Sequence, residues 1–160
     1  MDRRSFLKTT GTLAAAATIS KTSLAAAPIA AGRAVYPINR NWRYTPKTSA
    51  DVHSPTFNDA HMERVIVPHT NKAVPWHNFD DSVYEFVSAY RRPIAVPASA
   101  HHNKRVFVDF EGVMLASTVY CNGHKLGEYK GGYTPFSFEI TDHLKPSGNV
   151  ISLDVDSTER

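Results

Sequence analysis

The sequence predicts an all-β protein, an antiparallel jelly-roll sandwich, and three observations carry that prediction. Short segments after residue 55 alternate apolar and polar residues with the two-residue period of a strand. Turn signals separate these segments at intervals of roughly ten residues, as in sandwiches and jelly rolls. No segment in the same region repeats its apolar residues with the 3.6-residue period of a long helix.

The first two expected strands are rich in β-branched residues. The segment RVIVP, 64–68, ends at Pro68. The run EFVSAYRRPIAVP, 85–97, is longer, and we expect Pro93 to break it because proline cannot donate a hydrogen bond to a neighbouring strand.

Three further segments each place three apolar side chains on one face and polar ones on the other. The apolar faces are Val106, Val108 and Phe110; Phe136, Phe138 and Ile140; and Ile151, Leu153 and Val155. Phe107 interrupts the polar side of the first segment, so we expect that side to be partly covered. The stretch TDHLKPSGN, 141–149, allows one helical turn before Pro146.

Two glycine-containing pairs predict sharp turns. Asn122-Gly123 lies between STVYC and HKLGEY, and two residues that accept positive φ between strand-like runs indicate a two-residue hairpin. Gly131-Gly132 predicts a flexible corner after the second strand of that hairpin. Pro135 then favours an extended conformation at Thr134, which leads into the next strand.

The first 27 residues have the order of a signal peptide. Arg3-Arg4 followed by SFLK resembles the bacterial twin-arginine export signal, and an ordinary secretory signal is the alternative. The apolar stretch 12–19 is too short to span a bilayer, so no stable membrane anchor is expected. Cleavage after Ala25 would release the chain into the periplasm or the medium.

Residues 28–56 are polar and rich in proline, and we expect an extended arm before a domain over 57–160. Trp42 and Tyr44 are large apolar residues in this arm, and they are expected to pin it to the domain. Cys121 is the one cysteine, so no intrachain disulfide can form and a buried apolar role is expected.

The net charge of +3 does not indicate a nucleic-acid-binding protein. The first 25 residues hold four basic residues and one acidic residue, and the remainder holds 14 of each sign. The basic character therefore belongs to the leader, and no excess of positive charge remains to bind phosphates.

Several stretches together resemble the N-terminal domain of glycoside hydrolase family 2, in its β-galactosidase-like branch. They are VPHTNKAVPWHNFDDSVYEFVSAYRR, FEGV, VYCNGHKLGEYKGGYTPFSFEIT and NVISLDVDS, and the resemblance covers roughly residues 35–157. It implies a jelly-roll sugar-binding domain, galactose-binding-domain-like, followed in the family by an immunoglobulin-like domain and a catalytic TIM barrel. The barrel supplies two glutamates for retaining hydrolysis, with carboxyl groups about 5–5.5 Å apart.

The family's acid/base glutamate follows an asparagine, and this sequence contains no Asn-Glu pair. We therefore expect the sugar-binding domain of an exported glycosidase without the catalytic barrel, inactive alone. Its expected partners are carbohydrate and the enzyme's downstream domains. An autonomous exported carbohydrate-binding module is the alternative.

No local group predicts catalysis, metal binding or a cofactor. The acidic clusters Asp80-Asp81 with Glu85, and Asp109 with Glu111, read as solvated side chains. His101-His102 reads as part of a polar loop, since no partner lies at a zinc-site spacing. No glycine-rich phosphate loop occurs.

Carbohydrate contacts need an aromatic ring beside hydrogen-bonding groups. Most aromatic residues of a small sandwich belong to the core, and we expect this of Tyr84, Tyr129 and Tyr133. Trp76 lies in a loop. The residues predicted to lie near a substrate are Trp76, Ser88 and Tyr90.

Overall fold

The computed structural model describes residues 32–77, 80–100 and 104–158. The chain divides into two compact units, Met1–Tyr36 and Pro37–Arg160, and the fold below is that of the second unit. The signal residues Arg3 and Arg4 and the pair His101-His102 lie outside the described residues.

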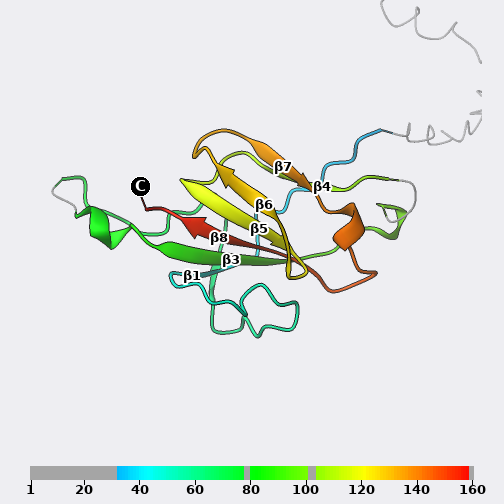
Figure 1. Cartoon of the computed structure of the whole chain (residues 1–160), viewed down its shortest axis with the longest axis horizontal. Coiled ribbons are helices and arrows are strands. Elements are labelled where there is room, and N and C mark those ends of the chain that lie inside the picture. Colours follow the sequence, from blue (N-terminus) through cyan, green and yellow to red (C-terminus); the bar gives the residue numbers. More distant parts are fainter. Residues whose placement is uncertain (1–31, 78–79, 101–103, 159–160) are drawn as a thin grey trace, which may run out of the picture. The chain divides into compact units, whose positions relative to one another are not determined.

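The second unit is an antiparallel β-sandwich (Figure 1). Its strands are β1 (Trp42–Thr45), β2 (Glu63–Val65), β3 (Val87–Ile94), β4 (Phe107–Phe110), β5 (Ala116–Cys121), β6 (His124–Lys130), β7 (Phe136–Glu139) and β8 (Asn149–Asp156). Six of them form one sheet in the order β2-β1-β3-β8-β5-β6, and β4 and β7 form a second sheet. The helices of the described residues are short 3-10 turns: η2 (Asp81–Val83), η3 (Ala98–Ala100) and η4 (Thr141–His143). The all-β sandwich predicted from the sequence is confirmed.

The hairpin between β5 and β6 is the one that the sequence predicts. Asn122 and Gly123 have φ angles of 52° and 87°, and Cys121 pairs with His124 across the turn. Positive φ at both central residues is the type I′ geometry that suits the twist of a hairpin. The Asn122 side chain also reaches β8, because its Oδ1 accepts a hydrogen bond from the Val150 amide at 2.9 Å.

The corner after β6 is also present. Gly132 has a φ of 53°, and the amides of Gly131 and Gly132 both donate to the Leu115 carbonyl at 3.2 Å. The corner therefore bonds to the segment that enters β5, and it turns the chain from the large sheet to β7 in the small one (Figure 1).

The inner faces of the two sheets enclose the main core. It consists of buried residues from β1, β3, β5 and β8 together with Val65, Val108 and Ile140. Phe136 and Phe138 pack against this core but stay half-buried, so the face predicted for them is right although its burial is incomplete. Gly127 on β6 makes room for Phe138, because a Cβ there would lie 2.5 Å from the Phe138 ring.

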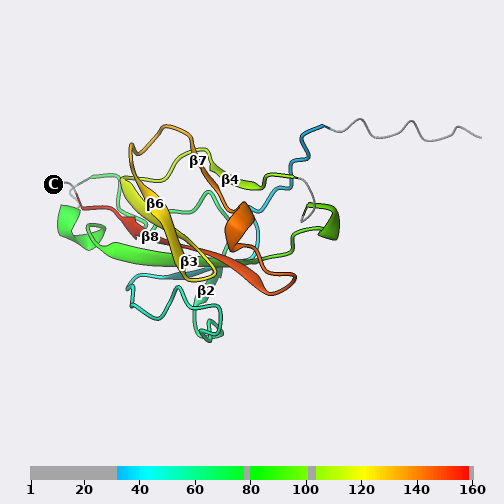
Figure 2. The ribbon, with the colours of Figure 1, turned by 45° about the vertical axis from the view of Figure 1, so that its right-hand side comes forward.

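The outer face of the large sheet is covered by the connection between β1 and β2. We call residues 46–62 the cover segment; Figure 2 shows it on the side of the large sheet opposite β4 and β7. Val52 and Met62 of this segment form a second apolar cluster with Ala89 of β3. The polar face of β8 is therefore partly covered too: Ser152 is 0% exposed, and Asp154 is half-buried.

Three boundaries differ from the sequence prediction. Strand β1 lies inside the expected arm 28–56 and pairs with both β2 and β3, so the sheet begins before residue 57. Strand β2 ends at Val65 instead of Pro68. Strand β3 continues through Pro93, which lies opposite Val150 one residue before the strand ends, where a missing donor costs little.

In the described ranges, no helix has the length and hydropathy needed to cross a bilayer.

Candidate functional site

The connection between β2 and β3 carries the most exposed large apolar side chain of the described chain. We call residues 66–86 the Trp76 loop; 66–77 and 80–86 are described. Trp76 is 89% exposed, and the His77 ring lies nearly perpendicular to its indole at 6.2 Å between centroids. The loop leaves the sandwich at the end where β3 begins and β8 ends (Figure 1). An exposed indole is a ready contact surface for an apolar or sugar face.

Asn71 holds the base of this loop. Its Nδ2 donates to the Tyr84 carbonyl at 2.9 Å and to Ser157 Oγ at 3.0 Å. The Asn71 carbonyl accepts a hydrogen bond from the Tyr44 hydroxyl at 2.9 Å. One residue thus joins the first part of the loop to its last part, to the end of β8 and to β1.

His69 forms a second tie between loop and core. Its Nδ1 lies 2.9 Å from the Tyr90 hydroxyl, and its ring contacts Tyr44 at 4.8 Å between centroids. Burial, and then the neighbouring Tyr44, raises the pKa of the Tyr90 hydroxyl. Tyr90 therefore remains protonated at neutral pH and keeps this hydrogen bond.

The three residues predicted to lie near a substrate occupy different environments. Trp76 is exposed, whereas Ser88 and Tyr90 are 0% and 9% exposed and face the inside of the sandwich. Ser88 Oγ lies 3.4 Å from the Val155 carbonyl. The structure does not bring the three side chains to one surface, but it links Tyr90 to the Trp76 loop through His69. A substrate contact by any of them stays a prediction.

Four carboxyl groups of the described chain have lowered pKa values, which does not suit acid catalysis. Hydrogen bonds from Arg105 and Thr141 hold the pKa of Glu139 at about 2, and bonds from Ser82 lower the pKa of Asp80. The pKa values of Asp51 and Glu128 are also lowered, mainly by hydrogen bonds from Ser49 and Lys125. Every resolved carboxyl shift in the described chain is thus downward, whereas a glycosidase acid needs a raised pKa.

A Ser-His-Asp cluster, which no local sequence pattern predicts, lies beneath the cover segment. His53 Nδ1 lies 3.0 Å from Ser152 Oγ, and His53 Nε2 lies 3.0 Å from Asp154 Oδ2. The ring stacks on Tyr120 at 3.7 Å between centroids. Because Ser152 is fully buried, its hydroxyl cannot reach a substrate, and the cluster ties the cover segment to β8.

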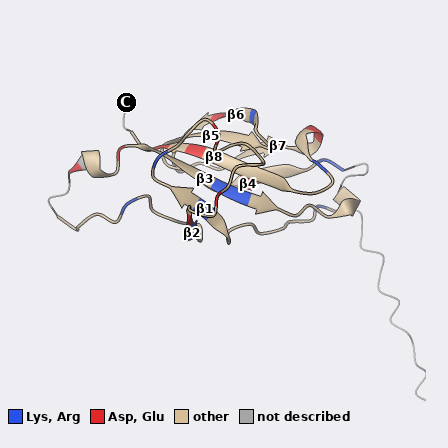
Figure 3. Cartoon of the chain, turned by 90° about the horizontal axis from the view of Figure 1, so that it is seen from below, with Lys and Arg blue, Asp and Glu red and all other residues tan. Residues whose placement is uncertain are grey.

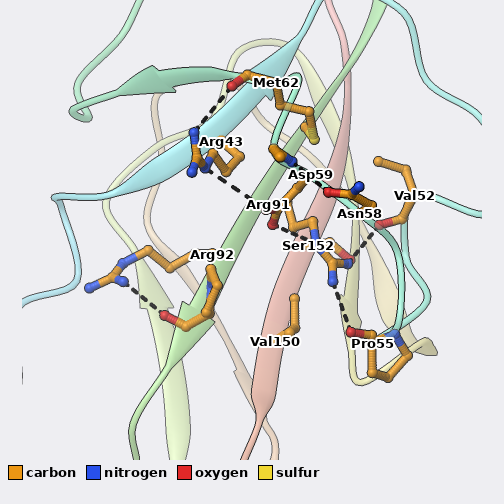
Figure 4. A network of polar contacts seen from close by, with 12 residues as sticks. Arg43, Val52, Pro55, Asn58, Asp59, Met62, Arg91, Arg92, Val150 and Ser152 are labelled. Carbon is orange, nitrogen blue, oxygen red and sulfur yellow. Dashed lines mark hydrogen bonds and ion pairs between the residues drawn. The ribbon is translucent and has the colours of Figure 1, made fainter.

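Arg91 is the other tie beneath the cover segment (Figure 4). It is 2% exposed, and its Nη1 donates to the carbonyls of Val52 at 2.8 Å and Ser54 at 2.7 Å. Nη2 donates to the Pro55 carbonyl at 3.2 Å, and Nε to Asp59 Oδ2 at 3.0 Å. The donors are used within the protein, so Arg91 is a structural residue.

A shallow, open depression lies on the cover segment, lined by Asp51, Ser54, Thr56, Phe57 and Asn58. Within residues 32–77, 80–100 and 104–158, no three His, Cys, Asp or Glu side chains gather as metal ligands. Figure 3 shows basic and acidic residues interspersed over the sandwich, in agreement with the balanced charge after residue 25.

Comparison with known families gives two matches. The model described as "Glycosyl hydrolase 2 galactose-binding domain-like" matches residues 38–160. The model of the twin-arginine translocation pathway signal sequence matches residues 1–20, which indicates export by that pathway.

Comparison with individual proteins points to the same group of enzymes. A β-galactosidase of Thermoanaerobacter pseudethanolicus is 42% identical over 130 residues, which cover 80% of this chain and 17% of that protein. A β-galactosidase of Thermoanaerobacterium thermosulfurigenes is 37% identical, with 80% and 18% covered. The crystal structure of a Bacteroides uniformis β-glucuronidase superposes with a TM-score of 0.66 at 25% identity, over 77% of this chain and 14% of that one. The chain thus spans less than a fifth of the length of these relatives.

Proposed function

Because the chain belongs to the glycosyl hydrolase 2 galactose-binding domain-like family, we propose that it is the carbohydrate-binding part of an exported β-galactosidase-like enzyme. The observation that carries this proposal is the family match over 38–160 together with the identity to two β-galactosidases. The family implies binding of carbohydrate. The choice of a β-galactoside as the sugar rests on the two relatives.

The domain's part in this function is binding. Hydrolysis with retention needs one protonated carboxylic acid and one ionised carboxylate flanking the same bond. The described carboxyl groups with resolved shifts have lowered pKa values, so they are ionised at neutral pH. We therefore do not assign the acid of the hydrolytic step to any of these four carboxyl groups.

Trp76 is the residue that we assign to the sugar. The apolar face of a galactose ring can pack on an exposed indole. Trp76 offers such a surface, because its side chain is largely exposed. Tyr90 supports this loop from inside the sandwich through its hydrogen bond with His69, whereas Ser88 is buried against the Val155 carbonyl.

The test uses the purified chain without its signal. Titration with methyl β-galactoside should change the emission of Trp76, and acrylamide, which reaches the exposed Trp76 but not the buried Trp42, should quench it less in the presence of sugar. Aryl β-galactosides and aryl β-glucuronides should not be hydrolysed.

Two results would contradict the proposal. Turnover that survives purification and is lost when Asp80 or Glu85 is replaced would make these described residues catalytic. A Trp76→Ala variant that binds the galactoside as tightly as the parent would remove Trp76 from the site.

A further inference from the structure

We propose that Asn71 is a positioning residue for the Trp76 site: it fixes the loop that presents the indole, without touching the sugar itself. This inference rests on the proposed function, because it concerns the same site. It assigns to Asn71 a role in carbohydrate affinity that is separate from any contribution to the stability of the sandwich.

The hydrogen bonds of Asn71 close the loop at its base. The Asn71 side chain reaches the Tyr84 carbonyl, 13 residues further along the chain, and Ser157 Oγ, 86 residues away. Both N–H groups of the amide are used in these two bonds, so the side chain has one orientation. The first and last parts of the loop are therefore held together beside the end of β8.

The partners of Asn71 are themselves fixed. Ser157 Oγ contacts the Tyr84 carbonyl at 2.5 Å and the Phe86 carbonyl at 2.9 Å, and the Ser157 amide donates to the Phe86 carbonyl at 3.3 Å. Ser157 directly follows β8, and Phe86 directly precedes β3. The base of the loop is thus bonded to the two central strands of the large sheet.

Trp76 is only five residues beyond Asn71, and its side chain has little contact of its own with the sandwich, since it is 89% exposed. Its position therefore depends on the base of the loop more than on packing around the indole. Affinity falls in proportion to the fraction of molecules in which the loop leaves its binding conformation, so the base can set affinity from a distance.

The experiment compares Asn71→Ala with Thr70→Val in the exported chain. Thr70 is the matched control, because it lies in the same loop and its exposed hydroxyl bonds only locally, to the Lys72 carbonyl at 3.0 Å. Lys72 gives a direct readout of loop opening, since trypsin can cut after it only where several residues are locally unfolded. Cleavage after the buried Arg91 reports unfolding of the sheet in the same digest.

We expect Asn71→Ala to accelerate cleavage after Lys72 at least about tenfold while cleavage after Arg91 stays within about twofold. We expect it also to raise the Kd for methyl β-galactoside about tenfold, because a smaller fraction of molecules then holds the loop in its binding conformation. Thr70→Val should leave the two cleavage rates and the Kd near the parent values.

The contrary outcomes separate the two proposals. Unchanged cleavage after Lys72 in Asn71→Ala, or equal acceleration after Lys72 and Arg91, would overturn the positioning role. A third outcome is that Asn71→Ala speeds cleavage after Lys72 alone, while Trp76→Ala leaves the galactoside affinity unchanged. That result would confirm that Asn71 fixes the loop, and it would contradict the sugar contact assigned to Trp76.

Discussion

Replacement of Arg91 by alanine should release the cover segment from the large sheet. The guanidinium makes four hydrogen bonds of 2.7–3.2 Å to three carbonyls and one carboxylate of residues 52–59. Its Cζ also lies 5.6 Å from the centroid of the Phe57 ring.

The expected loss in the free energy of unfolding is about 3–5 kcal/mol. Removing one partner of a buried ion pair costs about 3–5 kcal/mol, and each buried acceptor left unpaired costs about 1–3 kcal/mol. The total stays below the sum of these costs for two reasons. Asp59 keeps a longer contact with Arg43 at 3.9 Å, and water can hydrogen-bond the freed carbonyls once the cover segment lifts. A loss of this size is a large share of the 5–15 kcal/mol typical of a domain.

Urea unfolding followed by circular dichroism measures the effect as a shift in the midpoint at constant m-value. Arg64→Ala is the control, since Arg64 is an exposed arginine on β2 of the same sheet, and it should cost less than about 0.5 kcal/mol. Arg91→Lys should fall between the two, because an ammonium cannot reproduce the fork of the guanidinium. A loss below about 1 kcal/mol in Arg91→Ala, at an unchanged m-value, would refute the view that this residue holds the cover segment.

Three further predictions follow from single contacts. Gly127→Ala should cost about 1–3 kcal/mol in urea unfolding, because its Cβ would meet the Phe138 ring at 2.5 Å. The pKa of Glu139 is lowered to about 2, so its ion pair with Arg105 should stabilise the fold above the ordinary glutamate pKa of about 4.3. This stabilisation should be lost as the pH falls towards 2. In Arg105→Ala the melting temperature should therefore depend less on pH between about 4.3 and 2. Burial raises the pKa of the Cys121 thiol to about 11, so a thiol reagent at pH 7.5 should react only after unfolding, and rapid reaction with the native protein would contradict the buried position.

The features that the sequence predicts well are set by neighbouring residues. The hairpin at Asn122-Gly123 depends on two residues that tolerate positive φ, and the sequence shows both. The exposure of Trp76 agrees with its place in a polar loop outside the alternating segments. In each case the information lies within a few residues of the feature itself.

The features that it does not predict depend on distant partners. Strand β1 has only four residues, and it becomes a strand because β2 and β3 bond to its two edges. Ser152 and Asp154 alternate as an exposed polar face would, yet His53, about a hundred residues earlier, covers them. The hydrogen bond from Asn71 to Ser157 joins residues 86 positions apart, and no local pattern predicts it.

The place of β8 in the sheet constrains the order in which the protein can be assembled. It comes last in the chain among the described strands, and it lies between β3 and β5, pairing with each over at least six residues. Until Asn149–Asp156 have left the ribosome, those two strands present open edges with no strand between them, and their pairings with β8 are all of long range. The nascent chain should therefore fold as a unit after synthesis of β8, and earlier intermediates are the species most exposed to wrong strand pairing.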